Sequence, residues 1–76
     1  MQNQISHKGY VGQISVDIED DCLYVEVINA EGMYNMAEGK TPLEAKTAFE
    51  SMIDDYLTDC EIEGWEVIEP KVMAPA

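Results

Sequence analysis

The 76-residue sequence predicts a single α+β domain, in which an antiparallel sheet of three to four strands packs with one amphipathic helix across one face. Two patterns predict this fold class. Residues 41–64 carry apolar side chains at three- and four-residue steps, which is the period of a helix with one buried face. Residues 13–28 alternate apolar and polar side chains around an acidic turn, which is typical of two half-buried strands. The expected order of elements is β-β-β-α-β.

The helix is expected to begin after Thr41 and to end at Gly64. Thr41 suits the N-cap, Glu44 is placed to reach back to the Thr41 amide, and Pro42 suits the first helical position. Glycine at position 64 suits the residue that ends a helix. The face predicted to be core consists of Ala45, Phe49, Met52, Ile53, Tyr56, Leu57 and Cys60. The opposite face carries Lys46, Glu50, Asp54, Thr58 and Glu61, with Asp55 and Asp59 at its edge.

The first two strands are expected to form a hairpin. In the first strand Ile14, Val16 and Ile18 alternate with polar residues, which predicts one face toward the core. Residues 19–21 are three consecutive acidic residues and predict a tight turn. The second strand follows the turn, and its predicted core face consists of Leu23, Val25 and Val27.

The remaining segments flank this hairpin and the helix. Residues 1–8 are polar and are predicted to be a flexible lead-in, as residues 71–76 are at the other end. Residues 33–37 predict a short third strand that leads into the helix. Residues 65–68 have the composition of a strand and are predicted to return to the sheet before Pro70 stops them.

The charge of the chain is strongly negative. Sixteen acidic residues stand against four lysines and no arginine, which gives a formal net charge of −12. Affinity for phosphates comes from lysine and arginine, so we expect no direct binding to nucleic acid or to an anionic membrane. The charge suits a basic protein partner, although it also serves solubility alone. A domain of this size buries only about 60% of its unfolded surface, which favours a homodimer or a higher oligomer.

The cysteines and the N-terminal residues indicate a cytoplasmic protein. Cys22 and Cys60 lie far apart without metal-ligand spacing, which favours two reduced thiols that pack as small apolar residues. A disulfide bridge or a reactive thiol is the alternative. The sequence contains no signal peptide pattern and no apolar run long enough to span a membrane.

We expect no catalysis, no cofactor and no metal site. His7 is the only histidine, has no nucleophile motif near it, and is predicted to be a surface residue. The glycines at positions 9 and 12 lack the context of a dinucleotide-binding loop. The acidic turn at residues 19–21 lacks the alternating ligands of a calcium loop.

The candidate functional residues are therefore those that would contact a basic partner. Asp55 and Asp59 lie four residues apart on the helix and repel each other, a cost that solvent, a cation or a partner's arginine would relieve. Trp65 follows the helix, and both core packing and a place in an interface are open for it. The full predicted set consists of Glu19, Asp20, Asp21, Asp54, Asp55, Asp59 and Trp65.

Two motifs in this chain resemble a known family. The sequence Glu-Gly-Lys-Thr-Pro-Leu-Glu-Ala over residues 38–45, and Asp-Asp-Tyr-Leu over residues 54–57 with Cys60 and Gly64 after it, resemble the N-terminal domain of the HicB antitoxins. The likeness extends from about residue 8 to residue 70, beginning with Lys-Gly-Tyr. It implies a partial RNase H-like fold without nuclease activity. It also implies an oligomeric antitoxin that covers the RNA site of a small basic HicA-type RNase toxin.

The sequence departs from the family pattern in three respects. Val25 stands where the family usually has glycine, and Glu26 stands where it often has arginine. The DNA-binding segment that many members carry after this domain is not expected here. An alternative function is therefore a stand-alone acidic inhibitor that mimics nucleic acid, such as a phage inhibitor of a CRISPR effector. A relic of a metal-dependent nuclease is a third, weaker interpretation.

Overall fold

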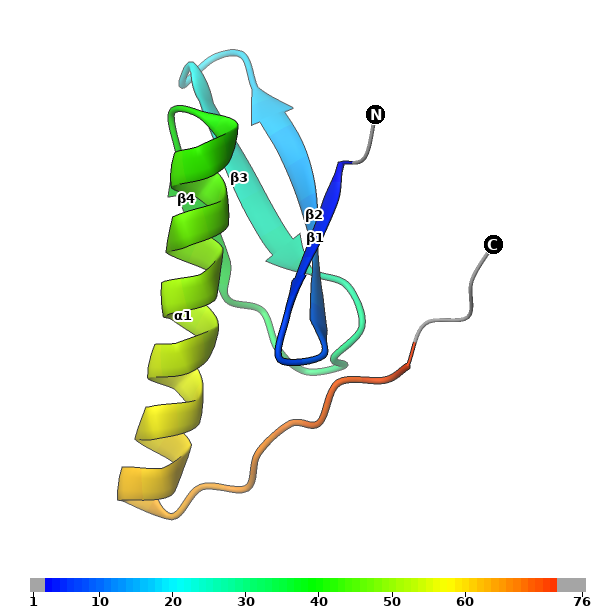
Figure 1. Ribbon diagram of the computed structural model, residues 1–76, viewed down its shortest axis with the longest axis vertical. Helices are drawn as coiled ribbons and strands as arrows, with labels where there is room; N and C mark the ends of the chain where they lie inside the picture. Colours follow the sequence, from blue (N-terminus) through cyan, green and yellow to red (C-terminus); the bar gives the residue numbers. More distant parts are fainter. Residues whose placement is uncertain (1–2, 73–76) are drawn as a thin grey trace.

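The computed structural model describes residues 3–72 and has two layers, a four-stranded antiparallel sheet and one long helix across one of its faces (Figure 1). The strands follow one another in the sheet in the order β1-β2-β3-β4. This arrangement confirms the predicted α+β class, but the order of elements is β-β-β-β-α, so the predicted order β-β-β-α-β is wrong. The elements are β1 Gln4–His7, β2 Tyr10–Asp17, β3 Cys22–Val27, β4 Met36–Gly39 and α1 Pro42–Glu63.

The helix begins and ends where its capping residues predict. The Thr41 hydroxyl accepts a hydrogen bond from the Glu44 amide at 3.1 Å, and Pro42 is the first helical residue. The Glu44 carboxylate contacts the Thr41 hydroxyl at 3.4 Å, where the sequence predicted a contact with the Thr41 amide. Gly64 adopts φ 70°, and the Trp65 amide donates to the Cys60 carbonyl at 3.0 Å. The predicted bounds of the helix are therefore confirmed.

The core lies between α1 and the sheet. The predicted apolar face of the helix is confirmed, because Ala45, Phe49, Ile53 and Cys60 are buried and the other predicted members are partly buried. The sheet and the helix contribute equally to the largest fully buried side chains, which are Tyr10 and Val25 of the sheet and Phe49 and Ile53 of α1. The buried residues of the core are Tyr10, Val25, Ala30, Met33, Ala37, Ala45, Phe49 and Ile53.

Two glycines let the helix lie close to the sheet. A Cβ atom on Gly39 of β4 would lie 2.3 Å from the Ala45 amide nitrogen, so the backbones of β4 and α1 touch where a side chain would otherwise stand. A Cβ atom on Gly12 of β2 would lie 2.4 Å from Val25 Cγ1 and 2.9 Å from Phe49 Cε1. Both distances are shorter than a Cβ atom tolerates, so the position of α1 on the sheet requires glycine at these two residues.

The predicted hairpin is confirmed as the pair β2 and β3, which are antiparallel with Ile14 opposite Val25. Strand β2 begins at Tyr10, earlier than the alternation of apolar and polar residues indicated. Tyr10 and Gly12 are the first buried residues of this strand. Val16 is 67% exposed, and Ile18 belongs to the turn and is 87% exposed, so the predicted place of both residues on the core face is wrong. The alternation continues through Ile18 in sequence, but the chain has already left the sheet there.

The prediction of a flexible lead-in is wrong for Gln4–His7, which form the edge strand β1 beside β2. Lys8 and Gly9 connect the two strands with φ values of 52° and 88°. Positive φ at both central residues is the conformation of a two-residue hairpin turn of type I′. Ile5 packs against the core and is the one large apolar residue of the strand, which explains its weak sequence signal. Residues 1–2 and 73–76, also predicted to be flexible, lie outside the described residues.

The predicted strand at residues 65–68 is wrong. This segment is extended without a strand partner, and it passes the turn between β1 and β2, where Pro70 lies beside Gly9 (Figure 1). Tyrosine side chains satisfy its backbone instead: the Tyr10 hydroxyl donates to the Ile68 carbonyl at 2.6 Å, and the Ile68 amide donates to the Tyr56 hydroxyl at 2.9 Å. Because β1 already occupies the edge beside β2, the returning segment finds no strand to pair with there.

The third predicted strand is shifted along the chain. Residues 33–37 were expected to form it, whereas β4 spans Met36–Gly39 and pairs with β3. The segment before it is a loop with Gly32 at φ 91°. Met33 is buried from this loop, so its apolar character reflects core packing rather than a strand.

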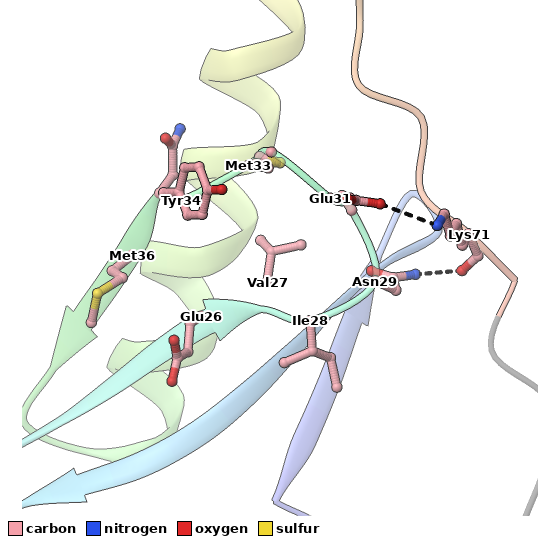
Figure 2. Close-up of a pocket in the computed structure, with 12 residues that line it drawn as sticks. Glu26, Val27, Ile28, Asn29, Glu31, Met33, Tyr34, Met36 and Lys71 are labelled. Atoms are coloured by element: carbon pink, nitrogen blue, oxygen red, sulfur yellow. Dashed lines mark hydrogen bonds and ion pairs between the residues drawn. The ribbon is translucent and has the colours of Figure 1, made fainter.

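Asn29 joins three segments of the chain. Its side-chain oxygen accepts from the Val11 amide at 2.8 Å, and its side-chain nitrogen donates to the carbonyls of Gly9 and Lys71 at 2.9 and 2.8 Å. Its own carbonyl accepts from the Lys71 amide at 2.7 Å. Figure 2 shows Asn29 beside Lys71, whose side chain also forms an ion pair with Glu31. Lys71 was expected to be flexible and is instead fixed by these bonds.

We expect Asn29→Ala to destabilise the fold by about 2–3 kcal/mol, because it leaves several buried backbone groups without partners. Asn29→Asp is the matched variant, since it keeps the acceptor for the Val11 amide but loses the donor to Gly9 and Lys71. Urea unfolding measures the stability, and amide hydrogen exchange at Lys71 measures the detachment of the C-terminal segment. Unchanged exchange at Lys71 in both variants would contradict the role of Asn29.

Candidate functional site

The surface between α1 and β4 contains an open groove of about 720 Å³. We call it the β4-side groove. One wall is the start of β4 with the residue before it, and the other wall is a stripe of the helix. The residues that line it are Asn35, Met36, Ala37, Ala48, Ser51, Met52, Asp55, Tyr56, Asp59 and Trp65.

The groove brings together three of the residues predicted to bind a partner. Ser51, Asp55 and Asp59 are spaced by four residues, so their side chains lie on one stripe of the helix. Trp65 joins them because the left-handed conformation of Gly64 turns the chain directly after the helix. Asp55 and Asp59 are exposed, and Trp65 is 59% exposed. Of the two places left open for Trp65, the structure therefore favours the surface.

Apolar side chains continue from this groove onto the neighbouring loop. Met36 lies in the groove and is 53% exposed, and Tyr34, two residues before it, is 87% exposed. Figure 2 shows both residues at the start of β4, beside the loop that follows β3. Exposed tryptophan, tyrosine and methionine beside charged residues are the composition of protein-binding surfaces. The sequence did not indicate Met36 for such a surface, because it lay inside a predicted strand.

Asp54 belongs to a different surface. Its carboxylate is 2.8 Å from His7 Nε2 and 2.8 Å from Lys8 Nζ, so it holds the turn between β1 and β2 against the helix. His7 is half-buried, and its Nδ1 lies 3.9 Å from the Glu50 carboxylate, so its prediction as an ordinary surface residue is wrong. Hydrogen bonds from Lys8 and then from His7 lower the pKa of Asp54. Asp54 is thus paired within the chain.

The acidic turn lies near the start of α1, whereas Asp59 and Trp65 of the β4-side groove lie near the end of that helix. Asp17 holds this turn, because its carboxylate accepts from the amides of Glu19 and Asp20 at 3.1 and 3.2 Å. Asp20 lines a hollow with Glu44 near the start of α1. Asp59 is fifteen residues further along the helix than Glu44, which is about 22 Å. Glu19, Asp20 and Asp21 therefore do not form one surface with Asp55 and Asp59.

The sheet face opposite the helix is a second acidic surface that the sequence did not reveal. The register places Tyr24 beside Glu38, and these residues share a hollow of about 320 Å³ with further carboxylates. We call this surface the outer sheet face. In the sequence its acidic residues lie far apart on three strands, and only the pairing of these strands brings them together. The residues that line the hollow are Asp17, Asp20, Cys22, Tyr24, Glu26, Met36 and Glu38.

Both cysteines are free, as predicted, and they differ in environment. Cys60 is buried on the helix, while Cys22 is half-buried on the outer sheet face. Desolvation raises the pKa of the Cys22 thiol, and Glu38 and Asp17 raise it further. The carboxylates around Cys22 therefore disfavour its thiolate, which is the reactive form.

The lysines are placed away from the β4-side groove. Lys8 pairs with Asp54, Lys46 lies 3.4 Å from Glu50, and Lys71 lies 3.5 Å from Glu31. Lys40 lies beside the hollow at the start of the helix. Within residues 3–72, no ion pair involves Asp55 or Asp59.

Residues 3–72 contain neither a cluster of metal-binding side chains nor a membrane-crossing helix. Among the described residues, no three histidine, cysteine or acidic side chains are grouped so that they could hold a metal ion. In that same range, α1 lacks the apolar length that a membrane-crossing helix needs.

No protein-family model, curated protein or solved structure matches this chain. The resemblance to the HicB antitoxins therefore stays a prediction from the two sequence motifs.

We expect Asp54→Asn to lower the thermal midpoint of unfolding at about pH 7 more than Asp55→Asn does, because only Asp54 holds the β1–β2 turn. The pKa of Asp54 is lower in the folded protein, so its stabilisation is present above the unfolded pKa and is lost as the pH falls through the folded pKa. The difference between the two variants should vanish at pH values well below the folded pKa of Asp54. A difference that persists there would contradict this account. Thermal melts followed by circular dichroism measure it.

Proposed function

We propose that this chain is a non-catalytic acidic binding protein that neutralises a basic protein by covering its RNA site, as a HicB antitoxin covers a HicA-type RNase toxin. One observation carries the proposal. The β4-side groove places the exposed Trp65 beside two carboxylates, Asp55 and Asp59, which form no ion pair within residues 3–72. A partner that supplies lysine or arginine relieves the repulsion between these carboxylates.

The groove divides the work of binding between its two kinds of residue. The carboxylates attract a basic partner from a distance and fix its orientation, which mainly raises the rate of association. Trp65 and Met36 lose exposed apolar surface when covered, and buried aromatic residues supply most of the affinity in protein interfaces. We expect the charged ends of the partner's lysine or arginine side chains to lie against Asp55 and Asp59. The aliphatic part of one of these side chains would cover Trp65.

The motifs that resemble the HicB family have separate roles in this fold. Residues 41–45 cap the helix and seat it on Gly39 of β4. In residues 54–57, Asp54 holds the β1–β2 turn, Asp55 faces the groove, and the last two residues pack against the core. The motif therefore supports both the fold and the proposed binding surface.

Two of the three departures from the family pattern, Val25 and Glu26, fall on opposite faces of β3. Val25 is fully buried against the helix layer, so it alters the core rather than the surface. Glu26 is exposed on the outer sheet face beside Met36. An acidic residue there, where the family often has arginine, extends the negative surface next to the groove.

We expect the double substitution Asp55→Asn with Asp59→Asn to weaken binding to a HicA-type toxin by at least about tenfold, and Trp65→Ala to weaken it by about 2 kcal/mol or more. Removing the carboxylates should slow association at low salt, whereas removing Trp65 should speed dissociation. Surface plasmon resonance at two salt concentrations separates these effects.

The matched control is Glu61→Gln with Glu63→Gln, which removes the same charge from exposed positions of α1 outside the groove lining. Equal losses in the control and in the groove variant would show that net charge alone acts. Full binding by the groove variant and by Trp65→Ala would overturn the proposed site.

The outer sheet face favours a second candidate function, that of a stand-alone acidic inhibitor that mimics nucleic acid. Asp17, Glu26 and Glu38 stand on three neighbouring strands around Tyr24, and the lysines that form ion pairs lie elsewhere. Such an arrangement of fixed negative charge suits a channel that binds phosphates. The aromatic ring of Tyr24 would then lie where a base stacks.

Under this second function, Glu26→Gln with Glu38→Gln should weaken inhibition of a nucleic-acid-binding complex by about tenfold, while Trp65→Ala should leave it unchanged. Added single-stranded nucleic acid should displace the inhibitor, and added salt should weaken its binding. Competition measured by fluorescence anisotropy tests both expectations. Binding that is insensitive to salt and to competing nucleic acid would contradict the mimic.

A further inference from the structure

We infer that the basic partner binds by adding an extended strand to the free edge of β4, along the β4-side groove. This inference rests on the proposed function and names the element of the partner that the groove accepts. β4 is the last strand in the sheet order, with β3 as its neighbour on one side. Alternate backbone N–H and C=O groups of an edge strand point away from its neighbour and are free to pair.

The edge of β4 and the groove are one continuous surface. Met36 and Ala37 of β4 line the groove directly, and Ser51 and Asp55 of α1 form the facing wall. The close contact between Gly39 and Ala45 holds the helix over this side of the sheet. An added strand would therefore pair with the backbone of β4 and lie under the helix stripe at the same time. Binding modes of this kind take affinity from the main chain and specificity from alternate side chains.

The charges around this edge specify what the added strand carries. Its side chains would alternate between the helix side, where Asp55 and Asp59 lie, and the outer sheet face, where Glu38 projects from β4 itself. Both sides are negative, so lysine or arginine is favoured on each face of the incoming strand. Trp65 offers an aromatic surface to the stem or the charge of one of these side chains.

A second copy of this chain is the other occupant that an open edge would accept. Pairing two β4 edges would bring the two sets of Asp55, Asp59 and Glu38 together, between chains that each carry a net charge of −12. Like charges directly opposed across strands are destabilising. The charge of the edge therefore favours a basic partner over self-association.

The test uses the full chain labelled with ¹⁵N and a peptide of about ten residues in which pairs of lysines alternate with pairs of valines, so that lysine falls on both faces of the added strand. This length is enough to cover the short strand β4. The matched control peptide has the same sequence with every backbone nitrogen methylated, so it keeps the charge but donates no hydrogen bond to a ladder from either edge. Trp65 fluorescence measures binding, and amide hydrogen exchange of Met36–Gly39 reports pairing at the edge.

We expect the lysine–valine peptide to bind at least about tenfold more tightly than the methylated peptide and to slow exchange of the edge-facing β4 amides. Asp55→Asn with Asp59→Asn should weaken both peptides by the same factor. Equal affinity of the two peptides without protection of β4 would overturn strand addition while leaving the proposed acidic binding function intact.

Two other results would also overturn the inference. One is that neither peptide changes Trp65 fluorescence or β4 exchange. The other is β4 protection that rises with protein concentration in the absence of peptide, together with a dimer mass in light scattering, which would place a second copy on the edge. If a HicA-type toxin still binds in either case, the proposed function stands and only strand addition is excluded.

Discussion

The contact between α1 and β4 at Gly39 determines how the helix lies over β4, and so it determines the shape of the β4-side groove. Because a Cβ atom has no room there, the helix backbone rests directly on the strand backbone at its N-terminal end. From that point the helix runs over the edge of the sheet (Figure 1), and its residues Ser51, Asp55 and Asp59 line the β4-side groove. A larger residue at position 39 would lift the helix and open the groove, which ties the binding surface to the packing of the core.

The position of Trp65 depends on a second set of interactions at the opposite end of the helix. Gly64 turns the chain, and two tyrosine hydroxyls fix the backbone of Ile68 three residues after Trp65. Asn29 then fixes Lys71. The segment between these anchors is short, so Trp65 is held near the groove before any partner arrives. A side chain that is already ordered loses less entropy on binding, which makes it a stronger anchor.

The sequence predicted the elements that depend on local signals and missed those that depend on distant partners. Caps at Thr41 and Gly64 and one helical period defined α1, and the same period placed Asp55 and Asp59 together. β1 escaped prediction because a single isoleucine gives little alternation, although Lys8 and Gly9 were a signal for a two-residue turn. Residues 65–68 have the composition of a strand, but whether they pair depends on β1, which lies about sixty residues away. The bond between Asp54 and His7 was invisible for the same reason.

The positions of the lysines explain why the negative charge of this chain is unevenly distributed over its surface. Lys8 and Lys46 neutralise the helix face toward the β1–β2 turn, and Lys71 neutralises the loop after β3. The same helix therefore has one side with compensated charge and another side, at the β4-side groove, where Asp55 and Asp59 keep theirs. The proposed basic partner would be attracted to the side that also offers Trp65 and the edge of β4. Charge, aromatic surface and backbone pairing thus converge on one edge of the sheet.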